Sequence, residues 1–131
     1  CIRDRNKAIV SDFVQTILMK VDMSQISKFI GEKDSDYIQH NVAVADGLSG
    51  LSVALKQLAE AGMPMVYSKN HLILGEGNFV LSVSEGQFMN QHVAFYDLFR
   101  VDNGKIVEHW DTIEAIPPKS EWKNGNGKFG F

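Results

Sequence analysis

Four residues near the C-terminal end, Glu108-His109-Trp110-Asp111, carry more chemistry than a strand needs. Side chains alternate along a strand, so His109 and Asp111 share one side and Glu108 and Trp110 the other. On an apolar side, desolvation would raise the pKa of the Asp111 carboxyl toward a value useful for proton transfer. Asp111 is therefore a candidate acid/base, and His109 a candidate donor or orienting group. The alternative for Asp111 is a solvated strand end, or a structural partner for Arg100 or Tyr96. We expect Glu108 and Trp110 at a surface or interface.

A second carboxylate, Asp97, joins this side only in one register of the preceding hairpin. A two-residue Asn-Gly turn would put Asp97 opposite Trp110. A three-residue turn with a glycine bulge would put it opposite His109. A one-residue change of register exchanges the faces of a strand, and the sequence leaves both open. In the second register one side carries Phe95, Asp97, Phe99, Val107, His109 and Asp111.

The stretch "YIQHN" supplies further candidates. His40 could line a pocket mouth as base or donor, or be a buried histidine bonded to backbone, and both readings stay open. Tyr37 is a candidate donor, with core packing as the alternative. A lone His-x-Asp pair is a weak metal motif, so we expect no metal. We also expect no cofactor, because no phosphate loop or dinucleotide fingerprint is present.

Composition limits the remaining possibilities. The chain has 131 residues, 44% of them hydrophobic, which suits a single domain over 1–131. Its net charge of −3 and lack of a basic run argue against nucleic acid and membrane partners. We expect no transmembrane span and no signal segment. The only cysteine, Cys1, excludes an internal disulfide and marks either a lipoprotein processing site or a trimmed start. A reducing, cytoplasmic location is expected.

Helical spacing of apolar residues comes first and strand patterns follow. This order predicts α+β architecture, with helices packed on one face of a curved antiparallel sheet. We expect a flexible tail over 123–131. The predicted helices cover 5–20, 24–30 and 49–61, and the predicted strands cover 65–74, 79–88, 92–101 and 105–113.

Five stretches together resemble the SnoaL-like polyketide cyclase family of the nuclear-transport-factor-2-like superfamily. They are "NKAIVSDF", "YIQHN", "ADG", "GEGNFVLSVSEG" and "FYDLFRVDNGKIVEHWD". The resemblance runs from about residue 6 to 122. It implies a cone-shaped, curved sheet wrapped around about three N-terminal helices, with a pocket at the open end. Ketosteroid isomerases share this fold, and members are often dimers.

The resemblance also implies roles for particular residues. Asp111 matches the acid/base aspartate of the cyclases. Asp97 matches an aspartate that, in the isomerases, donates to a dienolate oxygen, which favours the register that places both on one pocket. Asn41 stands where the isomerases have their base, and an amide cannot abstract a proton. The chain departs from many members at Val42, where they carry proline, and at Asn78, where they carry aspartate; neither change touches the pocket chemistry obviously.

These observations predict a small-molecule pocket protein. We expect a cofactor-free acid/base enzyme of cyclase, isomerase or aldol (lyase) type, acting on an apolar, carbonyl-bearing ligand as a homodimer. The alternative is a non-catalytic ligand-binding or dimerisation domain of the same fold, and a weaker possibility is a scaffold that binds a protein on its sheet. The expected catalytic residues are Asp111, Asp97 and His109, and the expected substrate-binding residues are His40, Tyr37, Asn41, Phe95 and Phe99.

Overall fold

The N-terminal helix α1 spans Ile2–Phe13 and continues without a break as a π-helical segment, Val14–Met19. The computed structural model describes residues 1–131. Buried Val10 and Phe13 recur at helical spacing, which is why the periodicity predicted this helix. Val21, with a φ of 56°, follows the π-helical segment.

Shorter helices connect α1 to the sheet. One 3₁₀ helix spans Met23–Lys28, where the sequence predicts the second helix, and another spans Asp34–Asp36. The third predicted helix is α2, Gly47–Glu60, which begins after Asp46. Gly62 follows its end with a φ of 73°, as the sequence indicates for a terminating glycine. None of the helices is long and apolar enough to cross a membrane.

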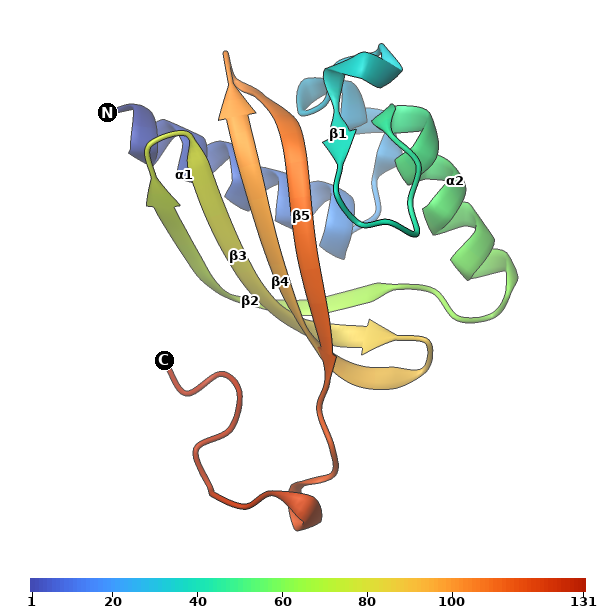
Figure 1. The fold of residues 1–131 in the computed structure, drawn as a ribbon, viewed down its shortest axis with the longest axis vertical. Coiled ribbons are helices and arrows are strands. Elements are labelled where there is room, and N and C mark those ends of the chain that lie inside the picture. Colours follow the sequence, from blue (N-terminus) through green and yellow to red (C-terminus); the bar gives the residue numbers. More distant parts are fainter.

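Five strands form one sheet in the order β1-β5-β4-β3-β2 (Figure 1). The four long strands are antiparallel, as predicted, and the short β1 adds to β5 in parallel. Helix α1 crosses one face of the sheet, and α2 lies beside β1 (Figure 1). The α+β class is therefore confirmed. The strand bounds are Ile38–Gln39 for β1, Val66–Glu76 for β2, Phe79–Phe88 for β3, Gln91–Asp102 for β4 and Lys105–Ala115 for β5.

The hairpin between β4 and β5 combines parts of both predicted registers. Asn103 and Gly104 have φ values of 49° and 78°, the type I′ pattern, and Val101 lies opposite Ile106. A bulge follows within β5, because Arg100 pairs with Glu108 and leaves Val107 without a partner. Asp97 therefore lies opposite Asp111, not opposite Trp110 or His109. Neither open register is reproduced in full: the bulge lies at Val107 and not at Gly104, and Asp97, His109 and Asp111 share one face of the sheet.

The core lies between α1, the segments after it and the inner face of the sheet. The Phe13 ring meets the edges of two other phenyl rings, Phe29 at 5.5 Å and Phe99 at 5.6 Å between centroids. Val10, Ile30 and Ile106 are fully buried around them. Burying an aliphatic or aromatic side chain of this size stabilises the fold by roughly 1.5–3 kcal/mol each. This packing attaches β4 and β5 to the helices through Phe99 and Ile106.

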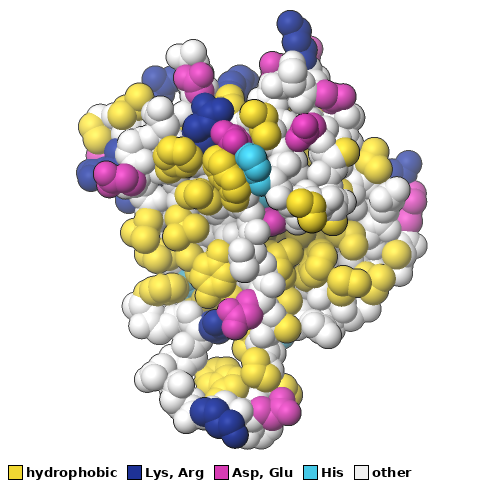
Figure 2. Space-filling view, viewed as in Figure 1, with side chains coloured by type: hydrophobic (Ala, Val, Ile, Leu, Met, Phe, Trp, Pro, Cys, Tyr) yellow, Lys and Arg dark blue, Asp and Glu magenta, His cyan; other side chains and the backbone are white.

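The outer face of the sheet carries a cross-strand row of Leu81, Leu98 and Trp110. These side chains are half-buried, and Figure 2 shows hydrophobic side chains gathered over β2–β5 on this face. The C-terminal segment touches the same sheet. Lys128 Nζ lies 2.5 Å from Glu114 Oε2, and the Phe129 ring stacks on His71 at 4.2 Å.

Candidate functional site

A small cavity of about 60 Å³ lies between the inner face of β4 and β5, α2 and the end of the N-terminal helix. Its walls are mostly apolar, with Leu51, Leu55 and Leu58 from α2, and Met65 just before β2. Its polar side chains are few and converge, as is usual for small-molecule sites. They are Tyr37, Gln39, Tyr67, Asp97, His109 and Asp111.

Asp97 is the deepest carboxylate of this cavity and is only 1% exposed. Its Oδ2 accepts a hydrogen bond of 2.8 Å from the Tyr67 hydroxyl. Its Oδ1 lies 2.8 Å from His109 Nε2. Both oxygens are therefore engaged within the protein. Burial raises the pKa of the Tyr67 phenol well above its ordinary value, and the Asp97 charge raises it further, so Tyr67 keeps its proton.

Asp111 lies directly across the strand pair from Asp97 but in a different environment. It is half-buried, and its Oδ2 accepts a hydrogen bond of 3.3 Å from Asn41 Nδ2. Its Oδ1 has no donor within the protein. Burial raises the pKa of the Asp111 carboxyl above its ordinary value of 3.8, as the sequence predicts, and the nearby Asp97 adds to the effect, while His109 and Asn41 oppose it. Asp111 thus lines the cavity and keeps one oxygen without a protein donor.

The third polar group is the phenol of Tyr37, whose side chain is 1% exposed. Burial, and then the charge of Asp97, raise the pKa of this phenol, so it remains a neutral donor. Its oxygen accepts a bond of 3.2 Å from Gln39 Nε2, and no protein acceptor takes its proton. The His109 ring is sandwiched nearby, stacked on Phe99 at 4.7 Å and on Tyr37 at 6.3 Å.

One group could in principle hold a cation. Ligand atoms of Asp97, His109 and Asp111 lie within 4.8 Å of one another. In this arrangement, however, Asp97 and His109 are bonded to each other, and Tyr67 occupies the other Asp97 oxygen. A cation would have to replace the contact between Asp97 and His109, whereas Asp111 keeps one oxygen without a protein donor.

The predicted site residues divide into two sets. Asp97, His109, Asp111, Tyr37 and Phe99 line the cavity together, and Asn41 reaches it through Asp111. Phe95 lies behind the wall, where it stacks on Tyr67 at 4.0 Å between ring centroids.

His40 lies away from the cavity, against the expectation that it stands at the mouth. Its ring stacks on Trp110 at 4.5 Å, and its Nε2 lies 2.6 Å from Glu108 Oε2. Arg100 Nε also donates to Glu108, at 2.8 Å. His40 and then Arg100 lower the pKa of the Glu108 carboxyl. The side chain of His40 therefore lies on the outer face of the sheet, against Glu108 and Trp110. These two side chains lie on that face because side chains alternate along β5.

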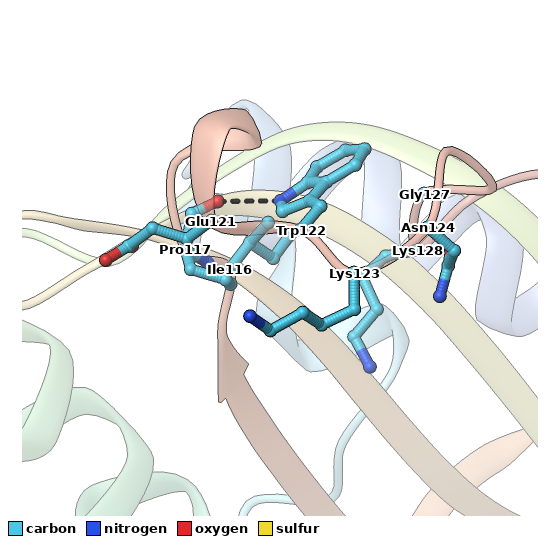
Figure 3. Close-up of a pocket in the computed structure, with 8 residues that line it drawn as sticks. All are labelled: Ile116, Pro117, Glu121, Trp122, Lys123, Asn124, Gly127 and Lys128. Atoms are coloured by element: carbon cyan, nitrogen blue, oxygen red, sulfur yellow. Dashed lines mark hydrogen bonds between the residues drawn. The ribbon is translucent and has the colours of Figure 1, made fainter.

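A larger hollow lies elsewhere in the molecule. It has a volume of about 440 Å³ and is formed by residues 116–128, around Trp122 (Figure 3). The Trp122 indole donates to the Pro117 carbonyl at 2.9 Å. This hollow is open, its polar lining is two lysines, a glutamate and an asparagine, and it contains none of the converging carboxylates. We therefore assign the candidate site to the smaller cavity, where apolar walls surround two carboxyl groups and an imidazole.

Two polar residues of the site, Gln39 and Tyr67, were not predicted from the sequence. The spacing of Gln39 could have predicted its place in the site. Gln39 lies two positions from both Tyr37 and Asn41 in an extended stretch, so all three face the same side. No sequence pattern predicts a place for Tyr67 in the site, because Tyr67 contacts Asp97 only once β2 has paired with β3 and β3 with β4.

The fold can be compared with those of known proteins. The chain has the curved-sheet, helix-filled fold of SnoaL-like cyclases and ketosteroid isomerase-like proteins. No protein family profile matches the chain, and no curated protein matches it by sequence. The resemblance noted above therefore has its support in solved structures.

Three solved structures illustrate the similarity. A candidate ketosteroid isomerase from Kribbella flavida is 12% identical, with a TM-score of 0.67 over 97% of this chain and 94% of that one. A SnoaL-like polyketide cyclase from Agrobacterium tumefaciens is 10% identical, with a TM-score of 0.61 over 83% and 91%. An LEH-like epoxide hydrolase from M. tuberculosis is 21% identical, with a TM-score of 0.60 over 87% and 86%. At these identities the similarity establishes the fold alone, and this fold hosts different chemistries.

Proposed function

We propose that this protein is a cofactor-free acid/base enzyme of isomerase, cyclase or aldol type. One observation carries the proposal. Asp111 and Tyr37 line one apolar cavity, and each keeps hydrogen-bonding capacity that no protein group uses: an acceptor oxygen on Asp111 and the hydroxyl proton of Tyr37. A base with a raised pKa and a neutral donor are what enolisation of a carbonyl compound requires.

Asp111 and Tyr37 together can carry out a complete cycle of proton removal and return. Asp111, as the carboxylate, removes a proton from the carbon next to the ligand carbonyl. Tyr37 donates a hydrogen bond to the carbonyl oxygen as negative charge develops there. The proton held by Asp111 then returns to the same or another carbon. In the aldol case the enolate carbon attacks a second carbonyl within the ligand, and Asp111 returns its proton to the alkoxide that this forms. Asp97 and His109 support the site by fixing its polar wall.

This assignment gives Asp97 a different role from the one the resemblance implies. Its oxygens are occupied by Tyr67 and His109. A carboxyl group in that state has no spare proton for a ligand oxygen. We propose that Tyr37 is the donor to the ligand and that Asp97 is a buried support.

The size of the cavity limits the ligand. At about 60 Å³ it is well below the roughly 300–1,000 Å³ of drug-sized sites. We propose that the substrate is a compact, largely apolar ketone, and that larger ones require movement of Met65 and the leucines of α2. Methionine and leucine side chains at a wall can adapt in this way.

The test is hydrogen–deuterium exchange at the carbon next to the carbonyl. Cyclic ketones of increasing size are incubated with the protein in deuterated water, and exchange is followed by NMR together with thermal shift. The proposal expects accelerated exchange with a compact ketone that also raises the melting temperature. Binding without exchange would instead support the non-catalytic ligand-binding alternative.

The outer face suggests the partner. We propose that a second copy of the chain covers the row of Leu81, Leu98 and Trp110. Two features support this: the row is apolar and continuous across three strands, and the fold resembles proteins that often dimerise. The paired charges of Glu108 and Arg100 flank the row and would lie at the rim of such an interface.

A further inference from the structure

The side chain of Gln39, on the short strand β1, makes three hydrogen-bonding contacts, two of them to side chains of the polar wall. Its Oε1 lies 3.0 Å from the backbone nitrogen of Asn41 and 3.1 Å from His109 Nδ1. Its Nε2 lies 3.2 Å from the Tyr37 hydroxyl. Its own backbone nitrogen donates to Asp46 Oδ1 at 2.9 Å, which anchors the residue in place.

The orientation of the Gln39 amide follows from one of these contacts. The backbone N–H of Asn41 can only donate, so the amide atom that faces it must be the oxygen. The same oxygen faces His109 Nδ1 and can only accept. Nδ1 must therefore carry a hydrogen, which fixes the tautomer of the imidazole when it is neutral. The other nitrogen, Nε2, is left to share a proton with Asp97.

The NH₂ group of the Gln39 amide donates a hydrogen bond to the Tyr37 hydroxyl oxygen. An NH₂ group can only donate, so it occupies a lone pair of the phenol oxygen. The Tyr37 hydrogen must then point in another direction, and no protein acceptor takes it. Because Tyr37 lines the cavity, this proton is available to an acceptor that enters the cavity. One amide thus sets the hydrogen positions of two side chains on the polar wall.

We propose that Gln39 is the positioning residue of this site: it holds His109 as the Nδ1–H tautomer and turns the Tyr37 hydroxyl proton toward the ligand. The second half rests on the proposed function, because it concerns the donor to a ligand carbonyl. The first half does not, since it concerns a tautomer that exists without any ligand. The two can therefore fail separately.

The test is NMR of the imidazole nitrogens in ¹⁵N-labelled protein, with His109 assigned from a His109→Gln sample. In the wild type, the neutral ring should show hydrogen on Nδ1. Gln39→Leu keeps the size but removes the acceptor, and it should move His109 toward the Nε2–H form. Gln39→Glu keeps an acceptor at the same position and should restore the Nδ1–H form. Gln87→Leu, on the exposed side of β3, is the matched control and should change nothing.

Exchange kinetics separate the two halves. A glutamate at position 39 cannot donate to the phenol and would accept its proton, so Gln39→Glu should slow exchange about 10-fold or more despite its restored tautomer. A wild-type ring with hydrogen on Nε2 alone, or an unchanged His109 pattern in a folded Gln39→Leu, would overturn the positioning role. Full exchange activity in Gln39→Glu would overturn the Tyr37 half. If no ketone exchanges but the tautomers behave as expected, the proposed function fails and the His109 assignment stands.

Discussion

Asp97 and Asp111 face each other across β4 and β5, yet they have opposite environments. Asp97 is 1% exposed and has partners on both oxygens. Asp111 is half-buried, has one partner and keeps one oxygen free. Two carboxylates in one cavity oppose each other's ionisation, and the hydrogen bonds decide which one remains available. In the proposed mechanism Asp97 is therefore the supporting aspartate and Asp111 the reactive one.

Asp111→Asn should abolish exchange while leaving the fold and ligand affinity intact. The amide keeps the shape of the carboxylate but cannot take a proton, and loss of a general base typically costs 10²–10⁴-fold in rate. Exchange kinetics and thermal shift with the same ketone measure the two quantities. Glu114→Gln, an exposed carboxylate on the same strand, is the control. Unchanged exchange in Asp111→Asn would show that another group is the base.

The pH dependence should follow the raised pKa of Asp111. Its carboxylate form acts as base, so exchange should increase as pH rises from 3.8 through the higher folded-state pKa. Stability changes in the opposite sense. Within this window the folded state binds more protons than the unfolded state, so the free energy of unfolding contributed by Asp111 falls as pH rises, and it is constant above the window.

Asp111→Asn removes that titration. Relative to wild type, the variant should therefore become more stable as pH rises through the window, and the difference should level off above it. Chemical denaturation across this range measures the difference. A stability difference that is independent of pH would contradict the raised pKa.

Tyr67→Phe should destabilise the protein by about 1–3 kcal/mol, because it leaves a buried oxygen of Asp97 without its donor. Urea denaturation gives the free energy of unfolding. Tyr96→Phe, on the outer face of β4, is the matched control and should cost less than about 0.5 kcal/mol. Equal effects of the two variants would mean that the Tyr67 hydroxyl does not support Asp97.

Leu98→Glu should convert the proposed dimer to a monomer, because it places a charge in the centre of the apolar row on the outer face. Sedimentation velocity of wild type and variant at equal concentration measures the change. Val53→Glu, at an exposed position of α2, should leave the dimer intact. A monomeric wild type would refute this interface.

Gly104→Ala should destabilise the hairpin by about 1–2 kcal/mol, because Gly104 has a φ of 78° that side chains with a Cβ disfavour. Gly125→Ala, where the added methyl group meets nothing within 4 Å, should cost far less. Thermal unfolding compares the two. Since this turn begins the register that brings Asp97 to Asp111, exchange activity should fall with stability on heating.

The sequence by itself determined the elements and their order. The helical spacing of Val10, Phe13 and Ile17 and the alternation along β5 are local properties, which follow from 3.6- and 2-residue periods. The same alternation separated His109 and Asp111 from Glu108 and Trp110. The fold class and the cavity-facing residues of β4 and β5 could therefore be predicted, once the resemblance favoured one face for Asp97.

The tertiary structure decided what no local pattern encodes. The bulge at Val107 depends on how β5 packs against the helices, where Ile106 donates its backbone hydrogen to Phe29 at 2.7 Å. The contact of Tyr67 with Asp97 joins residues on strands that are not neighbours. The displacement of His40 to the outer face follows from its bond to Glu108. These contacts are long-range, so the carboxylates could be named from sequence, but their separate roles came only from the folded neighbourhood.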